Sequence, residues 1–253
     1  MKRYIYKQLL AWKNEKEHKP LILNGARQVG KTYILREFGR NEYKRMAFFS
    51  LDRDQKALEI FNKGGRATDM LMALSAICHE DITPHDTLVV LDEIQNCPKA
   101  LEALKFFCEE TPEIDIVVAG SLLGLSIHSG VSYPVGKVEE LHLYPMTFLE
   151  FLEAMGKTQL VNLLENKNWT VINMLETELI SSLRQYYYVG GMPAAVLAHI
   201  EKKGWKEVRR IQQQIITDYR RDFSKHAPTR EIPRINMVWD SIPAQLAKEN
   251  KKF

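Results

Sequence analysis

Short runs of consecutive apolar residues recur along the first 147 residues, and between them apolar residues return at the spacing of a helix. The strands predicted from these runs lie at 21–23, 46–52, 87–91 and 115–121, and a fifth strand, in which charged residues interrupt the apolar ones, is predicted at 138–143. Runs of this length are typical of strands buried on both faces of a parallel sheet. The helical segments lie at 4–15, 33–38, 55–61, 69–78 and 98–107. This alternation predicts an α/β fold, a three-layer structure whose parallel sheet is covered by helices on both faces.

From residue 148 onward the pattern becomes helical. Predicted helices lie at 148–155, 159–164, 171–187, 196–200 and 205–221, with a last one from about residue 234. Residues 224–233 contain Pro228 and Pro233, which predicts a linker. We therefore expect three parts: an α/β core at 1–147, a helical subdomain at 148–223, and a linker with the start of a further domain at 224–253.

The first apolar run leads directly into a glycine-containing turn. Residues 25–32 follow the phosphate-binding pattern G-x-x-x-x-G-K-[ST]. Its glycines let backbone N–H groups line a cradle for phosphate oxygens, its lysine lies against the β- and γ-phosphates, and its hydroxyl binds Mg²⁺. The helix that begins here turns the positive end of its dipole toward the same place. The predicted nucleotide-binding residues are Gly25, Ala26, Arg27, Gln28, Val29, Gly30, Lys31, Thr32 and Tyr33.

The third apolar run ends in two carboxylates, Asp92 and Glu93. A buried parallel strand would bring Asp92 to the carboxyl edge of the sheet, where Thr32 holds Mg²⁺. Glu93 would then activate the water that attacks the γ-phosphate. We predict Thr32 and Asp92 as metal ligands and Glu93 and Lys31 as catalytic residues. Asp52 should reach the same edge and is the alternative base.

Ser121 ends the fourth apolar run. Two interpretations stay open: it contacts the γ-phosphate as part of the nucleotide site, or it caps the turn that follows. Residues 126–134 are predicted to form an exposed loop. Gly136 and Lys137 repeat part of the phosphate-binding pattern, but the upstream glycine and strand are missing, so we do not assign a second site there.

The composition and the apolar runs argue against a membrane protein, a secreted protein and a protein built on disulfides or zinc. No apolar run reaches the roughly 18 residues of a membrane helix, and the N-terminus lacks the apolar segment of a signal peptide. We therefore expect a cytoplasmic protein without membrane contact. Cys78, Cys97 and Cys108 form no C-x-x-C pair, which indicates reduced thiols, neither a disulfide framework nor a zinc site.

Taken in order, the motifs resemble those of bacterial and archaeal AAA-type ATPases that carry a DUF4143 C-terminal domain. The resemblance rests on 25–32, Leu-Asp-Glu-Ile-Gln at 91–95, Ala-Gly-Ser-Leu-Leu-Gly at 119–124, and 133–152, with Gly-Gly-Met-Pro at 190–193 and Ile-Thr-Asp-Tyr at 216–219. It implies a P-loop ATPase with sheet order 5-1-4-3-2, using ATP and Mg²⁺. It also implies a catalytic role for Glu93, a sensor role for Ser121, and a C-terminal domain that is truncated here.

Charge is unevenly distributed along the chain. Residues 200–253 hold 13 basic and 7 acidic residues, a net charge of +6, whereas the preceding residues hold 22 and 25, a net charge of −3. Part of the excess falls on one helix face, at Lys206, Arg209, Arg210 and Arg220. This basic face could bind DNA, or it could pack on an acidic surface of the C-terminal domain that the resemblance implies is missing, and we favour packing.

Two functions are consistent with these motifs. The first is Mg²⁺-dependent ATP hydrolysis, releasing ADP, coupled to a conformational change. The alternative is a nucleotide-gated module that binds DNA or a protein partner and turns over slowly. Arg27 and Lys137 are candidates for an arginine-finger role. The oligomeric state and the physiological role stay open.

Overall fold

The computed structural model describes residues 1–121 and 133–247, with backbone only at 224–226. The predicted loop at 126–134 therefore lies outside the described residues except for its last two, as do residues 248–253. Among the described helices, none is long and apolar enough to cross a membrane.

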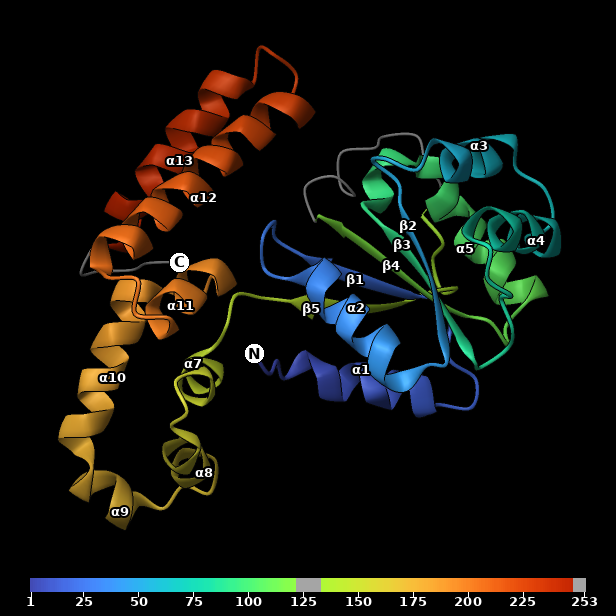
Figure 1. Cartoon of the computed structure of the whole chain (residues 1–253). Coiled ribbons are helices and arrows are strands. Elements are labelled where there is room, and N and C mark those ends of the chain that lie inside the picture. The colour runs from blue at the N-terminus through green and yellow to red at the C-terminus, as the bar shows by residue number, and fades with distance from the viewer. Residues whose placement is uncertain (122–132, 248–253) are drawn as a thin grey trace.

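Five parallel strands form one sheet (Figure 1). They are β1 (Leu21–Gly25), β2 (Arg45–Ser50), β3 (Thr87–Asp92), β4 (Asp115–Ser121) and β5 (Glu139–Leu143). Their order is β2-β3-β4-β1-β5. Read from the other edge this is 5-1-4-3-2, the order that the resemblance implied. The predicted α/β fold class is confirmed.

Helices cover both faces of the sheet, because successive residues of the central strands are all apolar and point to opposite sides. Val89 and Leu91 pack with α3 (Gln55–Lys63), α4 (Ala67–Cys78) and α5 (Pro98–Glu110). Leu88 and Val90 pack on the other face. That face is covered by α1 (Ile5–Asn14) and α2 (Lys31–Glu42). A single turn, η1 (Ile94–Asn96), follows β3.

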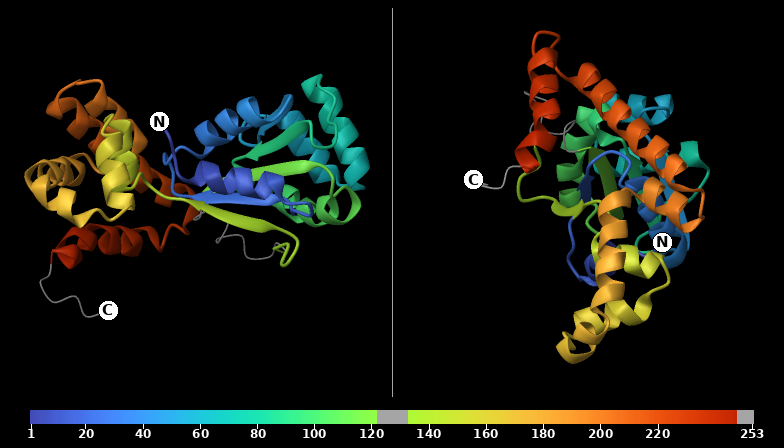
Figure 2. Two further views of the ribbon diagram at one scale, coloured as in Figure 1. Left: turned by 90° about the horizontal axis from the view of Figure 1, so that it is seen from below. Right: turned by 90° about the vertical axis from the view of Figure 1, so that its left-hand side faces the viewer.

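The remaining helices lie beyond the carboxyl ends of the strands and beside the sheet domain (Figures 1 and 2). They are α7 (Phe148–Ala154), α8 (Thr158–Glu165), α9 (Trp169–Met174), α10 (Glu176–Val189), α11 (Pro193–Ile200), α12 (Trp205–His226) and α13 (Ile232–Leu246). They have their own small core, which includes Met146, Phe151, Val196 and Val208. A capping box between Thr147 and Glu150 begins α7.

Two predictions about this region were wrong. The single helix predicted at 171–187 is two helices, because Leu175 leaves the helical conformation (φ −103°, ψ 15°) between α9 and α10. The linker predicted at 224–233 is shorter, because α12 continues to His226. Pro233 lies in the first turn of α13, where its missing N–H interrupts no helical hydrogen bond.

Candidate nucleotide-binding site

The phosphate-binding loop, residues 25–32, connects β1 to α2, and both of its glycines are required by the backbone. A Cβ atom at Gly25 would lie 2.4 Å from the carbonyl oxygen of Leu143 on the neighbouring strand. Gly30 has φ +97°, in the region that favours glycine, and immediately precedes the first residue of α2. The loop therefore turns tightly against β5 and ends at a helix N-terminus.

Lys31 lies across the loop. Its Nζ donates to the carbonyl oxygens of Gly25 and Ala26, both at 2.8 Å. An ammonium group has three donors, so one N–H stays available for a ligand. Burial lowers the pKa of Lys31, while the nearby carboxylates of Glu93 and Asp92 oppose that shift. The cation is thus held in place before any phosphate arrives.

Thr32 and Asp92 meet where the carboxyl end of β3 comes close to the start of α2. The Thr32 hydroxyl donates to Asp92 Oδ2 at 2.7 Å, and the backbone N–H of Glu93 donates to Asp92 Oδ1 at 3.0 Å. Asp92 is buried, and this burial raises its pKa. Mg²⁺ prefers such hard oxygen ligands and takes one or two from the protein, with waters and phosphates completing the shell. The two residues fit a Mg²⁺ site.

Glu93 directly follows β3 in a left-handed backbone conformation, with φ 56°. Residues other than glycine adopt this conformation uncommonly and at a cost in strain, and such strain recurs at functional sites. Its carboxylate accepts a hydrogen bond from the side chain of Gln95. The geometry therefore fixes a second carboxylate directly beside Asp92 and Lys31.

The other predicted site residues differ in their burial and in the partners they contact. Ser121 pairs with Gly25 in the sheet and is buried, and its hydroxyl has no hydrogen-bond partner among the described residues. An unpaired buried hydroxyl next to the loop is available to a ligand. Tyr33 is 59% exposed on α2. Asp52 instead forms local interactions with Ser50 and Arg53 on the outer side of β2.

The loop is also contacted by residues that the sequence did not indicate. On α12, Asp222 pairs with the Arg27 guanidinium (Oδ2 to Nε, 3.0 Å) and the Tyr219 hydroxyl donates to the Arg27 carbonyl oxygen at 2.8 Å. From the N-terminus, Arg3 donates to the Val29 carbonyl oxygen at 2.9 Å. No local motif marks these residues. One sequence feature could have pointed to Tyr219: it belongs to the Ile-Thr-Asp-Tyr segment at 216–219, which is among the motifs that carry the family resemblance.

The two candidates for an arginine-finger role are both engaged within the chain. Arg27 pairs with Asp222, as described. Lys137 precedes β5, at the opposite end of the strands from the loop, and its Nζ lies 3.0 Å from Glu109 Oε1. Neither side chain is presented to the phosphate position within this chain.

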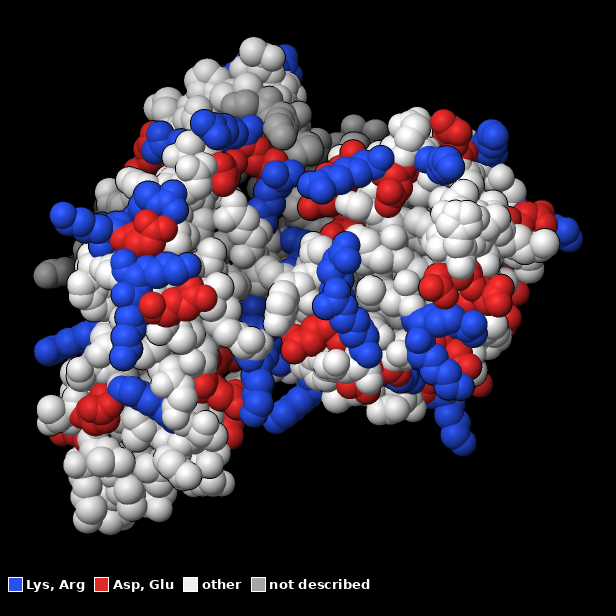
Figure 3. Space-filling model, in the orientation of Figure 1, with Lys and Arg blue, Asp and Glu red and all other residues white. Residues whose placement is uncertain are grey.

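Two of the four basic residues that define the basic face of α12 are paired with acidic neighbours. Figure 3 shows Lys and Arg interspersed with Asp and Glu over the helical region. Arg210 pairs with Glu207 at 2.7 Å, and Arg220 pairs with Asp240 of α13. Charges that are already paired contribute less to binding a phosphate backbone.

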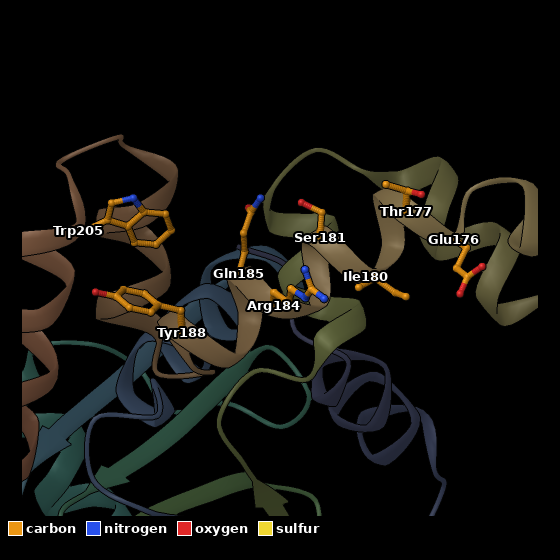
Figure 4. A pocket seen from close by; sticks show the side chains of 8 residues that line it. All are labelled: Glu176, Thr177, Ile180, Ser181, Arg184, Gln185, Tyr188 and Trp205. Carbon is orange, nitrogen blue, oxygen red and sulfur yellow. The ribbon is translucent and has the colours of Figure 1, made fainter.

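Two of the cavities at the helical region bear on where a nucleoside could bind. One, of about 460 Å³, lies between the N-terminal segment, α2 and α8; Arg3 and Ile34 are part of its lining, so it adjoins the flank of the phosphate-binding loop. The other, of about 830 Å³, runs along one face of α10 and ends at Tyr188 and Trp205 (Figure 4). The lining of this second cavity contains no residue of the loop and none that is hydrogen-bonded to it, as Arg3 is in the first cavity, so we do not assign nucleotide binding to it.

Comparison with known families gives two matches. A model described as an AAA domain matches residues 17–152, and a domain of unknown function, DUF8612, matches residues 180–253. The DUF4143 domain expected from the resemblance is therefore not found, and DUF8612 is matched in that region instead. Among curated proteins, none has detectable sequence similarity to the chain.

Comparison with solved structures finds remote similarity. A chain of the Drosophila ORC bound to DNA has a TM-score of 0.48 at 15% identity, with 83% of this chain and 66% of that chain covered. Cdc6p from Pyrobaculum aerophilum has a TM-score of 0.41 at 17% identity, covering 62% and 50%. PCH-2 from C. elegans has a TM-score of 0.35 at 11% identity, covering 64% and 46%. The chain thus spans less than two thirds of the length of each.

Proposed function

The chain belongs to the AAA domain family, and we propose that it binds ATP with Mg²⁺, hydrolyses it to ADP and couples turnover to a conformational change. Nucleotide binding and hydrolysis are activities of this family. The dependence on Mg²⁺, the roles of individual residues and the coupling are our proposal.

One arrangement carries the proposal: Lys31 is fixed across the loop, with the Thr32–Asp92 pair beside it. In the proposed complex the backbone N–H groups of the loop and the free N–H of Lys31 bind the β- and γ-phosphates. Thr32 and Asp92 hold Mg²⁺, which neutralises phosphate charge when bound. Glu93 accepts a proton from the attacking water, and Ser121 donates a hydrogen bond to the γ-phosphate.

The nucleoside would occupy the cavity beside α2. This cavity adjoins the loop through Arg3 and offers apolar and amide side chains, among them Val161 and Asn162. Such a mixture suits an aromatic base with polar edges. Since α8 lines this cavity, ATP would contact both the sheet domain and the helical region.

The alternative is a nucleotide-gated module that binds DNA or a protein and turns over slowly. Compensation of the basic face favours a protein partner over duplex DNA. If the basic face bound duplex DNA through four phosphate contacts, the slope of log K against log salt would be about −3.6. Because we favour a protein partner, we expect a duplex titration at two salt concentrations to show a much shallower slope.

Glu93→Gln tests the enzymatic proposal, because it keeps the shape of the side chain and removes the base. ATP should still bind, while single-turnover hydrolysis falls roughly 100-fold or more, the scale expected for losing a general base. Running the same assay with and without duplex DNA separates the alternatives, since the ATPase should hydrolyse ATP readily without DNA, whereas a nucleotide-gated module should turn over slowly. Unchanged hydrolysis in the variant would remove Glu93 from the mechanism, and Asp52 would be tested next.

A further inference from the structure

Helix α12 contacts the tip of the phosphate-binding loop at three points. Its Tyr219 and Asp222 contact Arg27, and Asp218 accepts a hydrogen bond from the Gln28 side chain at 3.0 Å. In Figure 1 the loop between β1 and α2 projects toward α12. About 190 residues of sequence separate the paired groups, so the contacts depend on how the helical region docks on the sheet domain.

The contacts to carbonyl oxygens determine which way the loop presents its N–H groups. Tyr219 binds the carbonyl oxygen of Arg27, and Arg3 binds that of Val29. No peptide bond among the described residues is cis, and in a trans peptide the C=O and the following N–H point in opposite directions. Two carbonyls held on the outside therefore turn the N–H groups of Gln28 and Gly30 toward the inside, where phosphate oxygens would lie.

The ion pair strengthens this docking. The Asp222 side chain is 2% exposed, whereas that of Arg27 is 35% exposed. Separating the two would leave a buried carboxylate without this cation, which is much less favourable than breaking an exposed pair. Movement of α12 away from the loop is therefore opposed as long as Arg27 stays in place.

We propose that Tyr219 and Asp222 are positioning residues, which hold the loop in its phosphate-binding shape and make docking of α12 and binding of nucleotide stabilise each other. Coupling of this kind is reciprocal: if docked α12 favours bound ATP, bound ATP favours docked α12. A partner that displaces α12 would then release nucleotide. The inference rests on the proposed ATP binding.

Tyr219→Phe removes one hydroxyl and keeps the ring that stacks on Trp239. Loss of one loop-orienting hydrogen bond should raise the Kd for ATP about fivefold, with saturated single-turnover hydrolysis unchanged. Tyr186→Phe is the matched control, because the Tyr186 hydroxyl also donates to a carbonyl oxygen, that of Met146 at 2.7 Å, away from the loop. Both variants lose a similar bond, but only Tyr219→Phe should weaken ATP binding.

The reverse direction is measured by hydrogen exchange of residues 205–223 in the full chain. Mg-ATP should slow exchange in the parent and in Tyr186→Phe, and should do so less in the Tyr219→Phe, Asp222→Asn double variant at saturating nucleotide. Asp222→Asn alone should raise the Kd about tenfold or more, because a charge-assisted contact is lost.

The outcomes separate the two proposals. A parent chain that does not bind ATP overturns the proposed function and this inference together. A parent that binds ATP while Tyr219→Phe and Asp222→Asn bind it equally well overturns the inference alone. Equal weakening in Tyr219→Phe and Tyr186→Phe also overturns it, because the effect would then follow general stability.

Discussion

Two buried aspartates lie at opposite edges of the same sheet. Asp115 begins β4, and its carboxylate lies 3.0 Å from the Nε2 of His18. Asp92 ends β3, and its hydrogen bonds come from neutral groups, the Thr32 hydroxyl and the Glu93 N–H. At the amino-terminal edge, the charge of Asp115 is therefore paired with a side chain of the same chain, His18. The carboxyl-terminal edge instead crowds two carboxylates beside Lys31, an arrangement that a bound cation and phosphates would complete.

The titration behaviour of the two edges differs for the same reason. Burial raises the pKa of Asp92, so its charged form is unfavourable in the folded chain. At the other edge, the hydrogen bond that the His18 ring donates to the Asp115 carboxylate raises the pKa of His18, so the charged form of that histidine is favoured. A buried charge that destabilises the fold is expected at a functional edge. A buried charge that is paired within the chain is expected at a structural edge.

The largest expected effect is on stability at the structural edge. Asp115→Asn removes the anion from a buried pair and should lower the free energy of unfolding by about 3 kcal/mol. Chemical denaturation without nucleotide measures it. A loss below about 0.5 kcal/mol, the range of an ordinary surface substitution, would show that the His18–Asp115 pair is not structural.

Asp92→Asn is the matched change at the other edge and should have the opposite sign. It removes a charge that burial disfavours, so the melting temperature without nucleotide should rise, while the effect of Mg²⁺ on ATP binding is lost. Destabilisation as large as that of Asp115→Asn would erase the distinction between the edges.

The next effect concerns ligand affinity. Lys31→Ala removes the cation opposite the phosphates and should raise the Kd for ATP about 30-fold or more, as expected for losing a buried charged contact. Lys44→Ala is the control, because Lys44 forms an exposed pair with Asp86 at the other edge. Calorimetry on both variants checks this, and parent-like ATP binding by Lys31→Ala would mean that the loop is misassigned.

Local patterns predicted the parts of the molecule that local chemistry determines. Most of the strands were predictable because each contains several consecutive apolar residues, and the loop because only glycine tolerates the conformation of Gly30 and the close approach at Gly25. The strand order came from the resemblance alone, since no pattern in five similar strands specifies their neighbours.

Contacts between distant segments were not predictable. Arg3, Tyr219 and Asp222 reach the loop only because the N-terminus and α12 dock on it, and apart from the Ile-Thr-Asp-Tyr segment at 216–219 nothing in their local sequence indicates that. The break at Leu175 was missed because neither glycine nor proline marks it. Similarly, Arg27 was a candidate for an arginine-finger role because local sequence does not show its partner on α12, Asp222.

The smallest expected effect is the pH dependence of the structural edge. The pKa of His18 is raised above its ordinary 6.5, so the stability contributed by its pair is fully present below pH 6.5 and is lost as pH rises through the folded value. Glu139 also raises this pKa, and the exposed His85 faces the same carboxylate at 3.9 Å. The free energy of unfolding should therefore fall above pH 6.5 in the parent and fall less in His18→Gln, and equal slopes would exclude the pair as the cause.

The most direct test of the functional edge is the melting temperature with Mg-ATP compared with ATP and EDTA. A ligand at about 100 times its Kd that binds only the folded chain adds roughly 2.7 kcal/mol to stability. Mg-ATP should raise the melting temperature by several degrees in the parent, and clearly more than ATP with EDTA does. Equal shifts in the two conditions would contradict a Mg²⁺ site at Thr32 and Asp92, and no shift in either would contradict the nucleotide site itself.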